Sequence, residues 1–532
     1  MDHTIQHLRQ QLEEERARFR GTLPANIAEL WRGFRGRIAV VLSGGGARGG
    51  YEAGTLLAFQ DAGLPTHILT STSIGSINAA SYAAHSEGYV GKAEALIDSW
   101  LDVVPTALGI DWSRYIVVLA GLIIASAGFG NLIRYWMSKN GYSIHLVLPA
   151  ATWISLGMAG LSILFFYSQL TYIYYVAAAK VGGRKWKPEP RKLAFSAIGN
   201  VCVWAFVVLF INYAHLDFSS GTLIHMRPET RIILGGGTAF LLLLWLSLRD
   251  RLSRLSREFL RLPLRSGLFP NFERARFLRE AIPAQGFRRS PIRVVFTAAD
   301  VKTGDERYFV NAPLDQVAAD PGVNRSFVQE KMETTEDVIQ AVIASSAYPM
   351  VYEVVPINGN LFTDGGIVAV EPIRPAIRLG ADVLFLVLVQ PLKQEPAPVQ
   401  TFLDVAMHTF DILMSQNLKV DLEMLKNANS VCMEHAARLK VRPEEVSLDV
   451  GGRDYRYMKS FTVQPSSNLN AGLLDFDGKI VAPDILRGYI DGEKAIAEFL
   501  AYVAEQPDFT PKYLLRLHPE EVRQTVVQTN LP

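Results

Sequence analysis

Two glycine-bearing turns decide how this chain of 532 residues folds. The first lies in Arg37-Ile-Ala-Val-Val-Leu-Ser-Gly-Gly-Gly-Ala-Arg-Gly49, and the second lies in His67-Ile-Leu-Thr-Ser-Thr-Ser-Ile-Gly-Ser-Ile-Asn-Ala-Ala80. In each, a run of strand length reaches a turn with glycine and gives way to a segment that permits a helix. Both stretches therefore predict a strand, a tight turn and a helix.

The second turn carries a candidate nucleophile. Ser73 stands where a nucleophile elbow places its serine, on a sharp bend between strand and helix that exposes the hydroxyl. Gly75 supplies room for the bend. In the first turn, consecutive glycines leave backbone N–H groups uncovered at the end of a strand, which suits an oxyanion hole. One turn thus offers a nucleophile, and the other offers donors for a developing negative charge.

The first turn also has a competing interpretation as a dinucleotide-binding fingerprint. Gly44, Gly46 and Gly49 match the spacing G-x-G-x-x-G after a strand, a pattern that is weak when it occurs alone. A dinucleotide site would need an Asp or Glu about 20 residues further on, near the end of the next strand. That strand ends in Ser71-Thr-Ser73 instead. We therefore favour an oxyanion loop over a nucleotide site or a purely structural turn.

A candidate base for the serine lies far downstream. Asn360-Leu-Phe-Thr363 is a short strand-like run that leads into Asp364, Gly365 and Gly366. Asp-Gly-Gly alone is typical of an ordinary hairpin turn. Here it follows a glycine loop and a serine elbow in the same chain, so we interpret Asp364 as a partner of Ser73.

The order of these motifs closely resembles that of the patatin-like phospholipase family. Members of that family are lipid acyl hydrolases with a Ser–Asp dyad and no catalytic histidine. The resemblance implies that Ser73 is the nucleophile and Asp364 the base. It also implies that Gly45 and Gly46 donate the oxyanion N–H groups, and Arg48 falls on the family's arginine in the glycine loop.

The resemblance covers roughly Arg37–Thr106 and Ser266–Leu500, with one departure. The family elbow reads Gly-x-Ser-x-Gly, whereas this chain has Ser71 where the first glycine belongs. Serine is small, so we expect room at the bend to survive and the catalytic rate to be affected more than the fold. The implied fold is a three-layer α/β/α catalytic domain. Further matches lie in Ala344-Ser-Ser-Ala-Tyr-Pro349 and from Phe296 to Gly304.

Composition favours contact with a membrane over contact with a polyanion. The net charge is +1, so no overall field attracts nucleic acid. Hydrophobic residues make up 49% of the chain, and the mean hydropathy is positive. Two cysteines, Cys202 and Cys432, allow no disulfide framework or zinc spacing, and His3 and His7 lack a third ligand nearby. We expect no cofactor or metal, and nothing in the sequence indicates a homo-oligomer.

Four long apolar runs without Asp, Glu, Lys or Arg, the second of them interrupted only by His145, predict transmembrane helices. The first, Tyr115–Ile133, is long enough to cross the hydrocarbon core. The second lies near Ile144–Phe166 within a longer run, Gly141–Ala179, that has room for one span or two. The third and fourth are Leu193–Ala214 and Ile232–Leu248. The predicted insertion is therefore all-α.

Basic residues set the predicted orientation of these spans. Lysines and arginines gather between the second and third spans and again after the fourth. The positive-inside tendency places both segments, and hence the catalytic domain and both termini, on the cytosolic side. An even number of spans is also what allows Ser73 and Asp364 to meet. Residues 251–265 then alternate leucine and arginine as a basic amphipathic helix suited to an anionic membrane surface, the alternative being a solvated spacer.

The chain order predicts a catalytic domain in two parts. Residues 36–110 form the first part and 266–505 the second, separated by the transmembrane insertion 111–250 and the basic helix 251–265. Residues 1–35 form a charged helical segment without a secretory signal, and 506–532 form a polar tail. Within these segments we expect helices at Leu23–Phe34, Ile74–Ala84, Phe402–Asn429 and Ala482–Tyr502, strands at Ile292–Thr297 and Val383–Val389, and loops at Pro391–Val399, Gly451–Tyr457 and Ser466–Asn470.

The sequence thus predicts a membrane-embedded serine hydrolase of the phospholipase A or lysophospholipase type, acting on ester-linked fatty acids of bilayer lipids. One rival is an α/β-hydrolase whose triad is completed by His408 or His435. Little chain precedes Ser73 to build such a sheet, which disfavours it. The other rival is a catalytically inert membrane scaffold, which the departure at Ser71 would suit. A transporter is disfavoured because the predicted spans contain no Asp, Glu, Lys or Arg.

Overall fold

The computed structural model divides the chain into two compact units, residues 2–110 with 266–532 and residues 111–265 with Met1. All residues that the structure describes belong to the first unit. The residues that the structure describes are 3–108, 110, 267–269, 271–311, 328–332, 334–391, 402–450, 453–505 and 515–517.

The four predicted spans, the basic helix at 251–265 and most of the predicted loop Pro391–Val399 lie outside the described residues. Within the described ranges, no helix combines the length and the apolar character that crossing a membrane requires. The transmembrane insertion therefore stays a prediction from sequence.

A mixed sheet forms the core of the described chain, in the order β13-β10-β1-β2-β4-β5-β6, with β9 also paired to β4 and β8 to β9. Strands β13, β10, β1, β2 and β4 run parallel, whereas β5 and β9 run antiparallel to β4. Every residue of β1, β2 and β10 is buried, as the continuous apolar character of β1 and β10 predicts for parallel strands covered on both faces. The bounds are β1 Ile38–Leu42, β2 Ile68–Thr72, β4 Arg293–Asp300, β5 Glu306–Val310, β6 Val328–Lys331, β8 Val355–Ile357, β9 Asn360–Asp364, β10 Val383–Val387 and β13 Lys459–Val463.

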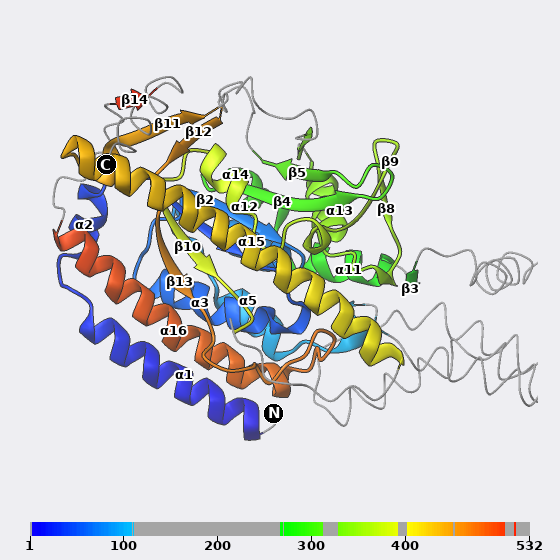
Figure 1. The fold of residues 1–532 in the computed structure, drawn as a ribbon. Coiled ribbons are helices and arrows are strands. Elements are labelled where there is room, and N and C mark those ends of the chain that lie inside the picture. Colours follow the sequence, from blue (N-terminus) through cyan, green and yellow to red (C-terminus); the bar gives the residue numbers. More distant parts are fainter. Residues whose placement is uncertain are drawn as a thin grey trace, which may run out of the picture. The chain divides into compact units, whose positions relative to one another are not determined.

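Helices cover both faces of this sheet (Figure 1). On one face, Phe385 of β10 packs against Phe59 of α3 and Phe499 of α16. On the other face, its neighbour Leu384 clusters with residues of α14 and with Leu418 of α15. Successive side chains of a strand point to opposite faces, so adjacent residues of β10 reach the two helical layers. The predicted α/β fold is confirmed. The bounds are α3 Gly49–Asp61, α14 Ile373–Arg378, α15 Phe402–Leu439 and α16 Gly478–Glu505.

The two glycine-bearing turns have the predicted form. Strand β1 leads into the 3₁₀ turn η1 (Gly46–Arg48) and then α3, and β2 leads into α4 (Ile74–Ala84). Because β1 and β2 are parallel neighbours, with Leu42 opposite Ser71, both turns emerge at the same edge of the sheet. Strand β9 pairs with β4 on the side away from β5, just beyond the end of β2, and so brings Asp364 to this edge. The 3₁₀ turn η5 (Gly365–Ile367) follows.

Several smaller predictions can be compared with the structure. The helix predicted at Leu23–Phe34 is present as α2 (Ile27–Gly33), and it packs on the domain, where Trp31 stacks on Phe499. The loop predicted at Gly451–Tyr457 is wrong, since β12 (Arg453–Arg456) pairs antiparallel with β11 (Val446–Val450). The predicted polar tail contains β14 (Leu515–Leu517), which pairs parallel with β11.

The other described elements are α1 His3–Thr22, α5 Glu94–Leu101, η2 Pro105–Leu108, β3 Gly267–Phe269, α11 Phe272–Ala281, α12 Ala284–Arg289, α13 Thr335–Ser345, β7 Met350–Tyr352 and η6 Pro443–Glu445.

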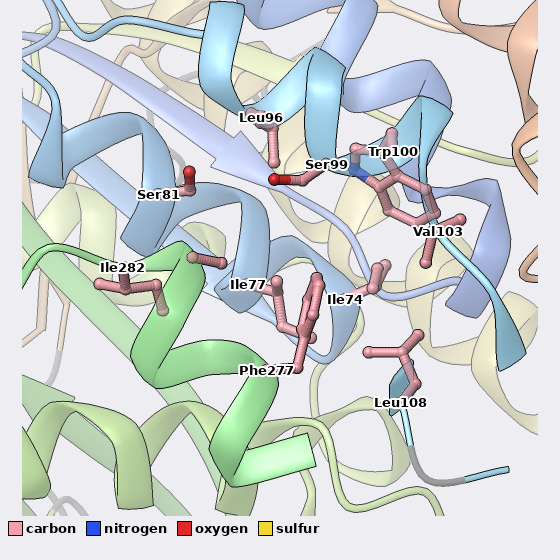
Figure 2. A pocket seen from close by; sticks show the side chains of 11 residues that line it. Ile74, Ile77, Ser81, Leu96, Ser99, Trp100, Val103, Leu108, Phe277 and Ile282 are labelled. Carbon is pink, nitrogen blue, oxygen red and sulfur yellow. The ribbon is translucent and has the colours of Figure 1, made fainter. Parts of the chain in front are cut away.

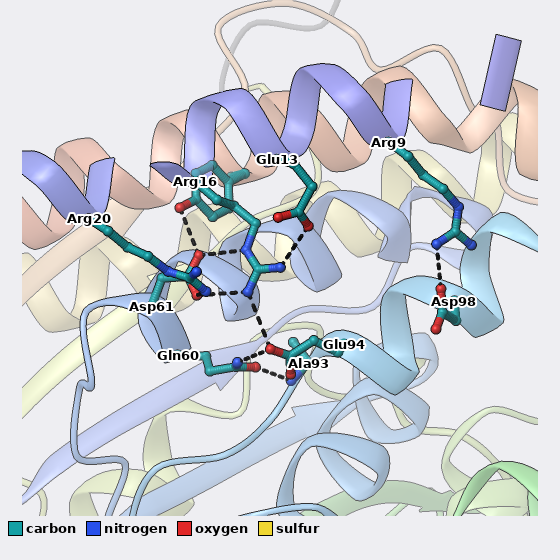
Figure 3. Close-up of polar contacts among 10 residues, drawn as sticks. Arg9, Glu13, Arg16, Arg20, Gln60, Asp61, Ala93, Glu94 and Asp98 are labelled. Carbon is teal, nitrogen blue, oxygen red and sulfur yellow. Dashed lines mark hydrogen bonds and ion pairs between the residues drawn. The ribbon is translucent and has the colours of Figure 1, made fainter. Parts of the chain in front are cut away.

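An ion cluster around Asp61 holds α1 against α3 (Figure 3). Arg16 binds both oxygens of Asp61 through two hydrogen bonds, of 2.8 and 2.9 Å. Arg20 also pairs with Asp61, and the Tyr489 hydroxyl donates to it at 3.0 Å. The side chains of Asp61 and Arg16 are 1% and 9% exposed. Such a bidentate, largely desolvated pair contributes more than an exposed ion pair does.

Replacing Arg16 by Met is expected to lower the free energy of unfolding by about 2 kcal/mol, because Asp61 loses two charge-assisted hydrogen bonds while staying buried. Arg9→Met is the matched control on the same helix, since Arg9 pairs with Asp98 where the two side chains are 37% and 60% exposed. We expect that change to cost less than about 1 kcal/mol. Urea unfolding of the two variants checks this, and equal losses would contradict it.

Candidate active site

Ser73 lies at the turn between β2 and α4 with φ 54° and ψ −124°. A residue other than glycine pays conformational energy in this left-handed region, so surrounding contacts must hold it there. Two glycines provide the space. A Cβ on Gly44 would lie 3.2 Å from the Ser73 Cβ, and a Cβ on Gly75 would lie 2.8 Å from the Ser43 carbonyl oxygen. The expected nucleophile-elbow geometry is therefore present, with Gly75 needed for the close approach.

The Ser73 hydroxyl donates a hydrogen bond of 2.5 Å to Oδ2 of Asp364. The other carboxylate oxygen accepts the Gly366 N–H at 2.8 Å. Ser73 is 7% exposed and Asp364 is 2% exposed. Burial raises the pKa of Asp364 to about 6, against the opposing effects of the two hydrogen bonds and of the Arg274 charge. A buried carboxylate that titrates near neutrality and already binds the hydroxyl is well placed to act as a general base.

The glycine loop next to Ser73 and Asp364 contains two backbone N–H groups, those of Gly45 and Gly46, that are candidate donors. The Gly44 N–H bonds to the Val370 carbonyl at 3.2 Å, and the Ala47 N–H bonds to the Leu473 carbonyl at 3.0 Å. Within the described chain, the intervening N–H groups of Gly45 and Gly46 have no such backbone acceptor. These are the two groups that the sequence assigns to an oxyanion hole.

Backbone contacts fix the course of that loop. Gly46 has φ +59°, and a Cβ there would lie 2.0 Å from the Leu473 carbonyl oxygen, so only glycine fits. Arg48 is partly buried as the last residue of η1, and Gly49 begins α3. The loop is therefore held by the segment around Leu473, which lies far from it in sequence.

Asn78 ties the elbow helix to the glycine loop. Its side-chain amide donates to the Gly49 carbonyl at 2.9 Å and to the Glu52 carboxyl at 2.8 Å. The Trp100 indole N–H donates in turn to the Asn78 oxygen at 2.9 Å. Burial raises the pKa of Glu52 well above its ordinary value. Asn78 was not predicted as a functional residue, although a side-chain amide in a helix predicted to be buried needs hydrogen-bond partners.

Two serines stabilise the elbow. Ser71, which replaces the family's glycine, is buried, and its hydroxyl donates to the Val295 carbonyl at 3.2 Å. The predicted room at this position is present. Ser345 accepts the Ser73 N–H at 3.1 Å. It lies in the stretch Ala344–Pro349, which resembles the family but for which no role was predicted. Its hydroxyl donates to the Thr297 carbonyl at 2.5 Å, so the strained turn is anchored to β4.

A largely apolar cavity of about 30 Å³ begins beside the elbow (Figure 2). Ile74, which directly follows Ser73, lines it together with Ile77 and Ser81 from the same face of α4. The opposite walls come from α5, the segment after it and α11. The residues on those walls are Leu96, Ser99, Trp100, Val103, Leu108, Phe277, Ala281 and Ile282.

The geometry disfavours a histidine triad. The hydrogen-bond partners of the Asp364 carboxylate among the described residues are the Ser73 hydroxyl and the Gly366 N–H. His435 is buried within α15 at 7% exposure, and Cys432 of the same helix is also buried. Ser73 and Asp364 therefore pair directly, without an intervening imidazole.

One comparison with known proteins bears on the class of reaction. The sequence model of a family described as patatin-like phospholipase matches residues 40–377, more than half of the chain, including the glycine loop, Ser73 and Asp364. The chain belongs to the patatin-like phospholipase family. Its patatin-like α/β domain supports a lipid acyl hydrolase activity in general terms.

Other comparisons are more distant. The crystal structure of VipD from Legionella pneumophila aligns with a TM-score of 0.31 and 13% sequence identity, over 93% of this chain and 73% of that one. No curated protein matches the sequence significantly. The family model is therefore the comparison that bears on function.

Proposed function

We propose that this protein is a serine hydrolase that cleaves ester-linked fatty acids from membrane lipids through a Ser73–Asp364 dyad. The observation that carries the proposal is the 2.5 Å hydrogen bond from the Ser73 hydroxyl to the buried Asp364 carboxylate. The family match supports the reaction class. A phospholipase A or lysophospholipase reaction suits this site, because each requires attack on an ester carbonyl.

In the proposed reaction, Asp364 accepts the hydroxyl proton as Ser73 Oγ attacks the ester carbonyl. The N–H groups of Gly45 and Gly46 bind the resulting oxyanion. The carbon–oxygen bond to the leaving alcohol then breaks, and the alcohol takes the proton from Asp364. Water, deprotonated by Asp364, attacks the acyl-serine, and the breakdown of this second tetrahedral intermediate releases the fatty acid and returns the proton to Ser73.

The cavity beside the elbow supports an acyl-chain substrate. It begins one residue from Ser73, and most of its lining side chains are aliphatic or aromatic. Apolar walls favour a hydrocarbon chain and penalise a charged headgroup, which would have to be desolvated there. We therefore place the acyl chain along α4 and α11, with the headgroup outside.

We also propose that the protein is embedded in a membrane through residues 115–133, 144–166, 193–214 and 232–248, with its catalytic domain on the cytosolic side. The support is the apolar, uncharged character of these runs and the distribution of basic residues around them. Permanent attachment would keep the site within reach of lipid esters.

Ser73→Ala and Asp364→Asn are expected to lower fatty acid release by roughly 10³-fold or more, because each removes one member of the dyad. The assay compares purified full-length variants on mixed phospholipid and neutral-lipid vesicles. His408→Ala and His435→Ala should retain activity. Hydrolysis that survives Ser73→Ala would contradict the dyad, and a wild type that neither hydrolyses lipid nor reacts with a fluorophosphonate would favour an inert scaffold.

Ala281→Phe is expected to shift the preference from long to short acyl chains, because the larger ring fills the cavity next to Phe277. The ratio of kcat/KM for a long-chain ester to that for a butyrate ester should fall by about 10-fold or more. Glu280→Phe is the matched control, since the Glu280 side chain is 65% exposed on the same helix. A similar change in both variants would argue against an acyl chain in this cavity.

The membrane proposal predicts that full-length protein stays in the membrane pellet after an alkaline carbonate wash, as integral proteins do. A peripheral protein held by the basic residues 249–265 would be released, because such binding is electrostatic. Release of most of the protein into the supernatant would overturn the proposed spans and leave the dyad unaffected.

A further inference from the structure

Arg274, on α11, is a buried cation that contacts no acidic side chain directly among the described residues. It is 1% exposed and is the largest of the fully buried side chains in the described chain. Its guanidinium donates to the Ile343 carbonyl at 3.1 Å, to the Ser346 carbonyl and to the Asn271 side chain at 2.6 Å. The ring of Tyr352 lies 4.0 Å below it. All of these partners are neutral, and a desolvated cation without an anion is costly to bury.

These contacts fall on the segment that supports the dyad. Ile343 and Ser346 flank Ser345, whose hydroxyl accepts the Ser73 N–H. The next residue, Ala347, accepts the Asp364 N–H at 3.0 Å through its carbonyl. The end of α13 is therefore fastened to Arg274 on one side and to both members of the dyad on the other.

Arg274 also acts on Asp364 through its charge. The guanidinium lowers the pKa of Asp364, which burial raises to about 6. Burial lowers the pKa of Arg274 itself to about 10, so it remains charged at neutral pH. No direct ion pair joins the two among the described contacts, so the cation acts from a distance.

Other charged side chains on the neighbouring elements form ion pairs with one another and not with Arg274. Arg279 pairs with Glu336 at 2.8 Å, and Arg307 pairs with Asp300 at 3.3 Å. The charged and titratable groups on the elements packed around Arg274 and Asp364 include Arg276, Arg279 and Glu280 of α11, Glu336 and Asp337 of α13, Arg293 and Asp300 of β4, Glu306, Arg307 and Tyr308 of β5, and Tyr352 and Glu353 at the end of β7.

We propose that Arg274 is a positioning residue whose charge keeps Asp364 ionised as the base for Ser73, while its hydrogen bonds hold the segment that carries both. This inference rests on the proposed dyad and extends it to a residue outside the three family motifs. Arg274 acts through Asp364 and does not itself contact the ester.

The test is the pH dependence of kcat/KM on a water-soluble p-nitrophenyl butyrate ester. In the wild type, kcat/KM should fall below about pH 6, where Asp364 becomes protonated and cannot accept the Ser73 proton. Arg274→Met removes the charge, and Arg274→Gln removes it while keeping N–H donors for the carbonyl groups. Without the cation the carboxylate is less stable, so its pKa rises and the acid limb moves upward by about one pH unit. Activity should drop about 5-fold at pH 6 and recover towards about pH 9.

Matched controls separate charge from packing. Arg279→Met removes an arginine from the exposed side of the same helix and should leave the acid limb in place. Arg274→Lys keeps a charge and should shift the limb less than Met or Gln does. An equal loss at every pH, an equal shift in Arg279→Met, or failure of both neutral variants to fold would show a purely structural role and overturn the proposal.

The same assay separates this inference from the proposed function. If Ser73→Ala retains the wild-type rate, the dyad itself fails. If Ser73→Ala is inactive and the Arg274 variants keep the wild-type acid limb, the dyad stands and only the role of Arg274 is refuted.

Discussion

The parallel pairing of β1 with β2 is the constraint on which the rest of the site depends. Leu42 lies opposite Ser71, so the glycine loop that follows one strand and the elbow that follows the other emerge side by side. Strand β4 lies on the other side of β2 and pairs in turn with β9, which ends at Asp364. Three motifs from distant parts of the sequence thus meet at one sheet edge, and a shift of one residue in either pairing would separate them.

Holding the elbow at this edge requires one strained backbone angle to be compensated by the surrounding contacts. Ser73 holds φ 54° because Ser345 accepts its N–H and Gly44 and Gly75 leave room around it. The side-chain N–H of Asn78 donates to Gly49 of α3 and its oxygen accepts from Trp100 of α5, so Asn78 joins the elbow helix to both. These contacts hold the elbow and the glycine loop in place, so the N–H groups that we propose as oxyanion donors are fixed before a substrate binds.

The sequence predicted the elements whose signals are local. Continuous apolar runs marked β1 and β10, and helix α4 begins and ends where its small apolar residues predict. The pairing of Ser73 with Asp364, 291 residues apart, was predicted only through motif order. Arg274 could not be predicted, because α11 also carries Arg276 and Arg279, and helical periodicity alone does not tell a buried arginine from an exposed one. The β11–β12 hairpin was missed because its two central glycines were interpreted as a loop.

A two-residue site depends on its surroundings in a way that a triad does not. The ordinary pKa of histidine already lies near neutrality, whereas the pKa of an aspartate reaches that range only if its surroundings raise it. Burial alone would raise the pKa of Asp364 and leave it protonated, but an arginine bonded directly to it would lower the pKa by 1–3 units and weaken the base. A cation tethered to neutral carbonyl groups and acting from a distance lies between these extremes. That balance explains why Arg274 is buried next to the dyad without forming an ion pair with it.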